Sequence, residues 1–159
     1  PELTNPVILT ADLGFAKHGR RYAMGLNIPL SFIEKRRIDN QDHTEALNLI
    51  GDVKHRDVIL IDDEVDTGGS ICEAVETAKL NGARDVYVAF IHPVLSSNAV
   101  KRLAALPVKR FITTNTIPLN ESQKATLGDR LTVLSIGPLL GEVIKRTNQS
   151  TSVGVMFNE

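Results

Sequence analysis

Short, unbroken apolar runs alternate along this chain with longer segments in which apolar residues recur every three or four positions. A continuous aliphatic run is typical of a buried strand, and the longer period is typical of a helix with one apolar face. The runs predict strands at 7–10, 30–33, 58–61, 86–91, 111–114 and 131–134. The longer periods predict helices that begin after Gly14, near Gly69, near Ser97 or Asn98, and at Gly137.

This alternation predicts the fold class. Strands separated by helices at such spacing form right-handed crossovers within a parallel sheet. We therefore expect an α/β fold, with a mostly parallel sheet and helices on both faces. The run at 58–61 is the most hydrophobic of the strands, which places it near the centre of the sheet.

A turn of small and polar residues follows the central strand. It consists of Asp66, Thr67, Gly68, Gly69 and Ser70. Glycines allow a close approach of the backbone to a ligand, and main-chain N–H groups can then point at an anion. A helix that begins near Gly69 and ends at 81–82 adds its positive end to the turn. The segment therefore predicts a phosphate site.

Carboxylates collect at the same end of the predicted sheet. Asp62 and Asp63 follow the central strand, and Asp12 follows the first strand. Because open α/β sheets bind ligands at the carboxyl ends of their strands, we expect these three acids to converge with the turn at 114–115. They can accept hydrogen bonds from ribose hydroxyls or hold hydrated Mg²⁺. The plainer alternatives are an ordinary acidic loop and, for Asp12, a turn residue.

Residues 34–42 are polar and charged and follow neither a helical nor a strand period. We expect them to form a mobile loop. Lys35 and Arg37 lie in this segment. Taken alone, such a basic cluster is most simply a solvated surface.

The composition favours one compact domain. With 159 residues, 42% of them hydrophobic, the chain can fill one core, so we expect a single domain over 1–159. A net charge of −1 gives no general attraction for nucleic acid or membrane, and we expect neither as a partner. The lone Cys72 and the absence of a leader-like apolar run predict a cytoplasmic protein. A start at Pro1 indicates an excised or processed piece.

The string DDEVDTGGS at 62–70 resembles the ribose-phosphate motif of type I phosphoribosyltransferases and of the ribose-phosphate diphosphokinase, or PRPP synthetase, family. Other segments resemble the latter family in the correct order: EKRR at 34–37, IGDV at 50–53, HPVLS at 92–96, TNTI at 114–117 and SIGPLL at 135–140. The resemblance covers 7–157. It implies a type I phosphoribosyltransferase-like fold and the carboxy-terminal half of a two-domain enzyme.

The resemblance also implies a reaction, in which the anomeric hydroxyl of ribose 5-phosphate attacks the β-phosphorus of MgATP and yields PRPP and AMP. It implies that Lys35 and Arg37 are catalytic cations over the transferring phosphates and that Asp12 lies near the nucleotide's metal, Mg²⁺. It implies that Asp62 and Asp63 face the ribose hydroxyls. The segment 66–70 is then the 5-phosphate loop.

The same resemblance sets the expected partners. In the family the amino-terminal half supplies the adenine site, so this chain alone should bind ribose 5-phosphate and make little product from ATP. The resemblance further implies a homo-oligomer, a hexamer built from dimers.

Two residues depart from the family pattern. After Asp12 and Gly14 the family has a second glycine and then an arginine, whereas this chain has Phe15 and His18. A histidine cannot make arginine's two-pronged phosphate contact. A regulatory homologue that has lost catalysis therefore remains an alternative. A phosphoribosyltransferase that consumes PRPP is a second one, although five Phe, two Tyr and no Trp offer little to cover a base.

Overall fold

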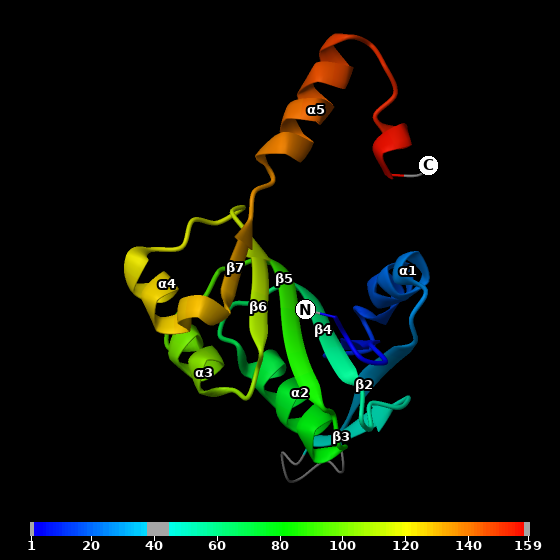
Figure 1. Ribbon diagram of the computed structural model, residues 1–159, viewed down its shortest axis with the longest axis vertical. Coiled ribbons are helices and arrows are strands. Elements are labelled where there is room, and N and C mark those ends of the chain that lie inside the picture. The colour runs from blue at the N-terminus through cyan, green and yellow to red at the C-terminus, as the bar shows by residue number, and fades with distance from the viewer. Residues whose placement is uncertain (1, 38–44, 158–159) are drawn as a thin grey trace.

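The computed structural model describes residues 2–37 and 45–157, and it contains one seven-stranded sheet (Figure 1). The strand order is β3-β2-β1-β4-β5-β6-β7, so β4 is the central strand, as its apolar run predicts. All neighbours pair in parallel except β2 and β3, which are antiparallel. The strands are β1 Val7–Thr10, β2 Leu30–Arg37, β3 Glu45–Ile50, β4 Asp57–Glu64, β5 Asp85–His92, β6 Arg110–Thr114 and β7 Leu131–Leu134.

Five α-helices and two short 3₁₀ turns connect or follow the described strands. They are α1 Ala16–Leu26, α2 Gly69–Leu80, α3 Ala99–Ala105, α4 Glu121–Leu127, η1 Gly128–Arg130, α5 Gly137–Asn148 and η2 Gly154–Phe157. Within the described ranges, no helix has both the length and the apolar character that a membrane crossing requires. The parallel sheet and its connecting helices confirm the predicted α/β architecture.

The main core lies between the sheet and the helices α2 and α3. Leu9, Leu60, Val88 and Phe111 pair in register across four neighbouring strands, and all four are fully buried. Because side chains alternate along a strand, this row points to one face only. Apolar residues of α2 and α3 belong to the same cluster, as does Leu127 of α4, so these helices cover this face.

The opposite face is only partly covered. Ile8 and Ile61 point to it and pack with Ala23 of α1 in a smaller cluster. Helix α1 approaches closely at Gly19, where an added Cβ would lie 2.6 Å from the Cγ2 of Thr10. Helices thus occupy both faces, as predicted, but among the helices of residues 2–37 and 45–157 only α1 packs on the second face, near β1 and β4.

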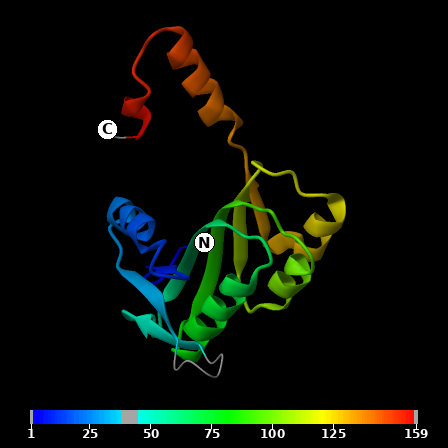
Figure 2. The ribbon, with the colours of Figure 1, turned by 180° about the vertical axis from the view of Figure 1, so that it is seen from behind.

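Helix α5 does not close the rest of this face. Both views place it beyond the end of β7, directed away from the sheet (Figures 1 and 2). It has no buried residue, and Leu139, Leu140 and Ile144 are exposed. An amphipathic helix with a bare apolar face is typical of a surface that contacts another polypeptide.

The prediction of a mobile loop at 34–42 is wrong for residues 34–37. Strand β2 continues to Arg37 and pairs antiparallel with β3, from Phe32 opposite Ile50 to Arg37 opposite Glu45. A neighbouring strand satisfies the backbone hydrogen bonds, so charged side chains are tolerated at the rim of a sheet. The remaining positions of the expected loop, 38–42, lie outside the described residues.

A buried ion pair anchors the amino end of the central strand. The carboxylate of Asp57 is fully buried and accepts hydrogen bonds from the Nε and Nη2 of Arg84 and from the N–H of Thr4. Burial acts to raise the pKa of Asp57, but the Arg84 and Thr4 hydrogen bonds outweigh it and hold the pKa below its ordinary value. The carboxylate therefore stays charged and depends on its partners.

We expect Arg84→Met to lower the melting temperature at pH 7 by on the order of 5 °C or more, because it leaves a buried carboxylate without its counter-ion. The matched control is Lys109→Met, which removes a cation from an exposed 3.6 Å pair with Asp85 and should have little effect. The measurement is thermal unfolding of both variants. Equal losses in the two would contradict a special role for the Asp57 pair.

Candidate functional site

The candidate site lies at the carboxyl ends of the central strands. Strand β4 extends beyond its apolar run, so Asp62, Asp63 and Glu64 are its last residues. Asp62 pairs with Phe90 and Glu64 with His92 on β5, while β1 ends on the other side of β4. Parallel pairing thus places the acids of β4 between two neighbouring strand ends.

The loop after β4 surrounds a cavity of about 190 Å³. Its lining residues are Asp62, Glu64, Val65, Asp66, Thr67, Gly68, Gly69, Ser70 and Ile71. The five residues predicted to hold a phosphate are therefore brought together around one hollow. Glu64 is an addition that the sequence reasoning missed, although the run of three acids at 62–64 contains it.

Backbone geometry explains why glycine occupies the turn before α2. Gly68 has φ +78°, in the left-handed region that favours glycine, and it is the N-cap residue of α2. The N-cap residue forms no side-chain hydrogen bond with the first N–H groups of the helix. A helix start of this kind, together with the loop amides, suits an anion.

Asp62 and Asp63 have different surroundings, as the divergence of successive strand residues predicts. Asp62 is partly buried and lines the loop cavity, whereas Asp63 is exposed. Each carboxylate accepts the N–H of the next residue, at 3.0 Å from Asp63 and 2.9 Å from Glu64. These bonds hold both side chains beside the turn.

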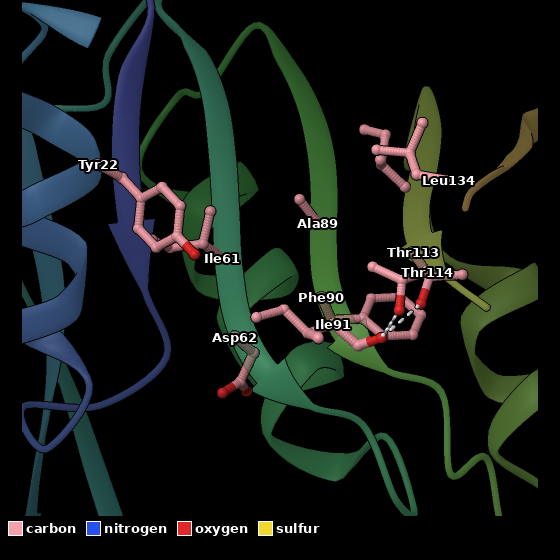
Figure 3. A pocket seen from close by; sticks show the side chains of 10 residues that line it. Tyr22, Ile61, Asp62, Ala89, Phe90, Ile91, Thr113, Thr114 and Leu134 are labelled. Carbon is pink, nitrogen blue, oxygen red and sulfur yellow. Dashed lines mark hydrogen bonds between the residues drawn. The ribbon is translucent and has the colours of Figure 1, made fainter. Parts of the chain in front are cut away.

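Asp62 also borders a second, apolar cavity of about 150 Å³ on the open sheet face. Figure 3 shows Tyr22 of α1 pointing toward Ile61, with the carboxylate of Asp62 turned away from the apolar residues. At the far side, the hydroxyl of Thr114 donates to the carbonyl of Ile91 at 2.8 Å. Of the expected convergence between three acids and the turn at 114–115, this cavity brings together Asp62 and Thr114, whereas Asp12, Asp63 and Asn115 are not among its lining residues.

The acids at this edge repel one another. Burial raises the pKa of Asp62 to about 7, and the carboxyl groups of Asp63 and Asp12 contribute in the same direction, while the N–H of Asp63 opposes the change. Asp12 is therefore close enough to influence Asp62. Such a perturbed carboxyl group at a cavity is typical of a binding site, because a ligand can offset the unfavourable charge.

Asp12 is held by its own turn. Its Oδ1 accepts the N–H of Phe15 at 2.8 Å, and the ring of Phe15 stacks on His18 at 5.1 Å between centroids. The turn-residue role of Asp12 is therefore present, and the turn bond uses one of its two carboxylate oxygens. The two departures from the family pattern contact each other beside this acid.

The described residues, 2–37 and 45–157, contain no group of three or more His, Cys, Asp or Glu side chains that could hold a metal ion alone. Mg²⁺ does not require such a group, since it commonly keeps several waters and binds one or two carboxylates plus substrate oxygens. Asp12 and Asp62 fit this kind of partial site.

The predicted cations lie on β2. The Nζ of Lys35 pairs with the Oε2 of Glu73 at 2.8 Å, and Glu73 belongs to the first turns of α2. Lys35 is therefore next to the helix that begins at the loop cavity. Arg37 is the last residue of β2, and its side chain lies outside the described part of the structure.

Comparison with known proteins gives one family match. The model of the phosphoribosyl synthetase-associated domain matches residues 36–158. A ribose-phosphate pyrophosphokinase of Helicobacter pylori is 41% identical over 155 residues, which are 98% of this chain and 47% of the relative. The chain thus spans about half the length of the relatives it matches.

Solved structures agree with this match. The phosphoribosylpyrophosphate synthetase of Mycobacterium smegmatis superimposes with a TM-score of 0.82 at 37% identity, over 92% of this chain and 46% of that one. The orotate phosphoribosyltransferase of Aeropyrum pernix, with a TM-score of 0.53 at 20% identity over 88% of this chain and 65% of its own, shares the fold alone. The predicted phosphoribosyltransferase-like fold is confirmed.

The raised pKa of Asp62 predicts a pH-dependent cost in stability. The folded pKa of about 7 exceeds the ordinary 3.8, so the folded protein binds more protons between these values. The contribution of this group to stability is therefore present below about pH 4 and lost as the pH rises through 7. The Asp62→Asn variant does not lose stability in this way, because asparagine does not ionise.

We compare the free energy of unfolding of Asp62→Asn with that of the original protein at each pH. The variant's advantage should grow by on the order of 1 kcal/mol or more between pH 5 and pH 8. Urea unfolding at several pH values provides the measurement. The control is Asp129→Asn, an exposed acid in η1 at the amino end of β7. A difference that does not change with pH would contradict the assigned electrostatics.

Proposed function

This chain belongs to the phosphoribosyl synthetase-associated domain family, and from this membership we propose that it is the ribose-5-phosphate-binding part of a ribose-phosphate diphosphokinase. The observation that carries the proposal is the loop cavity, where the main chain of 65–70 and the acid Asp62 surround one hollow. A sugar phosphate has the matching pair of groups, an anion at one end and hydroxyls at the other.

The proposed pose follows from the chemistry of the lining. The 5-phosphate lies against the N–H groups of the turn and the amino end of α2, because these are the concentrated donors of the cavity. The ribose hydroxyls then face Asp62 and Asp63, whose carboxylates accept hydrogen bonds. Binding of hydroxyls or a cation there offsets the burial and the repulsion that together raise the pKa of Asp62.

In the complete enzyme we propose that the anomeric hydroxyl of the bound sugar attacks the β-phosphorus of ATP, so that a diphosphoryl group moves and AMP leaves. Such a transfer depends chiefly on positioning and on neutralisation of charge. Lys35 and Arg37, on β2, would supply positive charge to the transferring phosphates. When bound, Mg²⁺ would neutralise phosphate charge, and Asp12 and Asp62 are the residues that would hold it.

The ATP site is proposed to need further polypeptide, since the matched relatives are about twice as long as this chain. The apolar residues of α5 and the open sheet face are the surfaces of this chain that best suit such a contact. A homo-oligomer, a hexamer by resemblance, is part of the same proposal. The chain alone should bind the sugar phosphate and form little PRPP.

A regulatory homologue without catalysis is the second candidate function. The stacked pair of Phe15 and His18, in place of the family's glycine and arginine, favours it. The retained acids at 62–63 favour the enzyme instead, because a cluster of like charges lowers stability and has no purpose in a protein that binds no ligand there. A phosphoribosyltransferase that consumes PRPP has no specific observation in its favour.

We expect the chain to bind ribose 5-phosphate in the presence of Mg²⁺ and to bind ribose, which lacks the phosphate, at least about tenfold more weakly. Gly68→Ala should weaken ribose 5-phosphate binding by roughly tenfold, because an alanine at φ +78° costs about 1–2 kcal/mol. Isothermal titration calorimetry measures both effects.

The matched control for this change is Gly128→Ala. Gly128 also has positive φ, at +56°, but it lies in η1 rather than at the loop cavity. Its replacement should leave sugar-phosphate affinity unchanged. The proposal is wrong if the original chain binds ribose 5-phosphate no better than ribose.

In the intact parent protein, we expect Lys35→Ala to lower kcat for AMP release by on the order of 100-fold with a much smaller change in KM, because the cation is needed most as charge moves. Lys124→Ala is the control, since Lys124 also forms an exposed 2.8 Å pair, with Glu121. A parent that releases no AMP and PRPP above background would favour the regulatory homologue.

A further inference from the structure

Three successive carbonyl groups at 65–67, in the loop that follows β4, accept hydrogen bonds from the segment before α3 and from α3 itself. The carbonyl of Val65 accepts the N–H of Leu95 at 2.9 Å, and that of Asp66 accepts the N–H of Ser96 at 3.1 Å. The carbonyl of Thr67 accepts the Nη1 of Arg102 at 3.4 Å. Residues 95 and 96 lie between β5 and α3, and Arg102 belongs to α3.

These three contacts determine where the loop amides point. Within one planar peptide unit, the C=O and the N–H point in opposite directions. In an extended strand successive carbonyls alternate, so three that bond to the same neighbour require a bend in the chain. The N–H groups of residues 66, 67 and 68 are therefore turned away from α3. Successive N–H groups on one side form the concave arrangement that binds anions.

The loop cavity lies on that other side. Its lining consists of residue 62 and residues 64–71, and Leu95, Ser96 and Arg102 do not belong to it. The three donors therefore lie on the side of the loop opposite the cavity, and the N–H groups of residues 66–68 point toward the cavity. A ligand in the cavity would meet the amides without touching the three groups that orient them.

Arg102 differs from the other two donors because it acts through its side chain. Leu95 and Ser96 donate from the backbone, so substitutions there leave the contact in place. Helix α3 is anchored without Arg102, since Ala99, Val100 and Leu103 are its buried residues. Removal of the guanidinium should therefore release the Thr67 carbonyl and leave the packing of α3 intact.

The charge of Arg102 adds a second effect, which the test must separate from positioning. Burial raises the pKa of Cys72, in the first turns of α2, and the guanidinium of Arg102 opposes that rise, so its field reaches the start of the helix. A cation beside a helix amino end is unfavourable while the cavity is empty, because the helix dipole is positive there. The arrangement becomes favourable when an anion occupies the cavity.

We propose that Arg102 is a positioning residue for the bound phosphate, which holds the Thr67 carbonyl from behind the loop and thereby aims the N–H of Gly68 into the cavity. This inference rests on the proposed binding of a sugar phosphate. It concerns a residue that touches neither the sugar nor the reacting atoms. Its effect should fall on affinity for the phosphate end of the ligand.

The test compares Arg102→Met with Lys101→Met in the 159-residue chain, titrated calorimetrically with ribose 5-phosphate and with inorganic phosphate. Lys101 is the preceding residue of α3, so both variants lose one positive charge from the same helix. We expect Arg102→Met to weaken both ligands by about tenfold and Lys101→Met by less than about twofold. The melting temperatures of both variants should stay within about 2 °C of the original.

Two further readouts separate positioning from simple attraction. The tenfold ratio should persist from 0.05 M to 0.5 M salt, because a direct hydrogen bond is screened less than a distant charge. In the free protein, the amide ¹H–¹⁵N resonance of Gly68 should shift in Arg102→Met and not in Lys101→Met. Arg102→Leu, a second variant without a donor, should repeat both results if the methionine variant folds poorly.

The outcomes are distinct. Unchanged phosphate affinity in Arg102→Met, an equal loss in Lys101→Met, or a ratio that vanishes at high salt would each overturn the positioning role and leave the proposed function standing. If the original chain binds neither ribose 5-phosphate nor inorganic phosphate, the proposed function fails, and this inference fails with it.

Discussion

The arrangement of this site depends on the parallel pairing of β4 between β1 and β5. Backbone hydrogen bonds fix the register, with Leu60 level with Leu9 and Val88, and the burial of this row against α2 and α3 prevents slippage. A parallel sheet brings the carboxyl ends of its strands to one edge. The acids after β1 and β4 and the loop before α2 are therefore neighbours as a consequence of core packing.

Charge at this edge opposes folding stability. Burial and neighbouring acids raise the pKa of Asp62 to about 7, whereas at the opposite end of β4 the buried Asp57 is paired with Arg84 and keeps a low pKa. The same strand thus carries one carboxylate that Arg84 and Thr4 stabilise and one whose pKa is raised by burial and by neighbouring acids. This asymmetry separates a structural ion pair from the kind of perturbed acid that is typical of binding sites.

The open parts of the fold are as informative as the closed ones. One sheet face is sealed by α2 and α3, while the other retains an apolar cavity between Tyr22 and Leu134, and α5 projects with a bare apolar side. Such surfaces fit a chain that spans about half the length of its relatives. The loop cavity lies wholly among described residues of this chain, and it shares Asp62 with the apolar cavity of the open sheet face.

Local sequence determined the central strand, the glycine turn and the acids at 62–63, because apolar runs and left-handed turns impose short-range demands that few residues meet. The start of α4 is also marked locally, because Asn120 and Gln123 form a capping box there. The strand character of 34–37, the apolar cavity and the contact of Arg102 with Thr67 arise from tertiary structure alone. Each depends on partners 8 or more residues distant, and pairing over such distances is set by packing of the whole sheet.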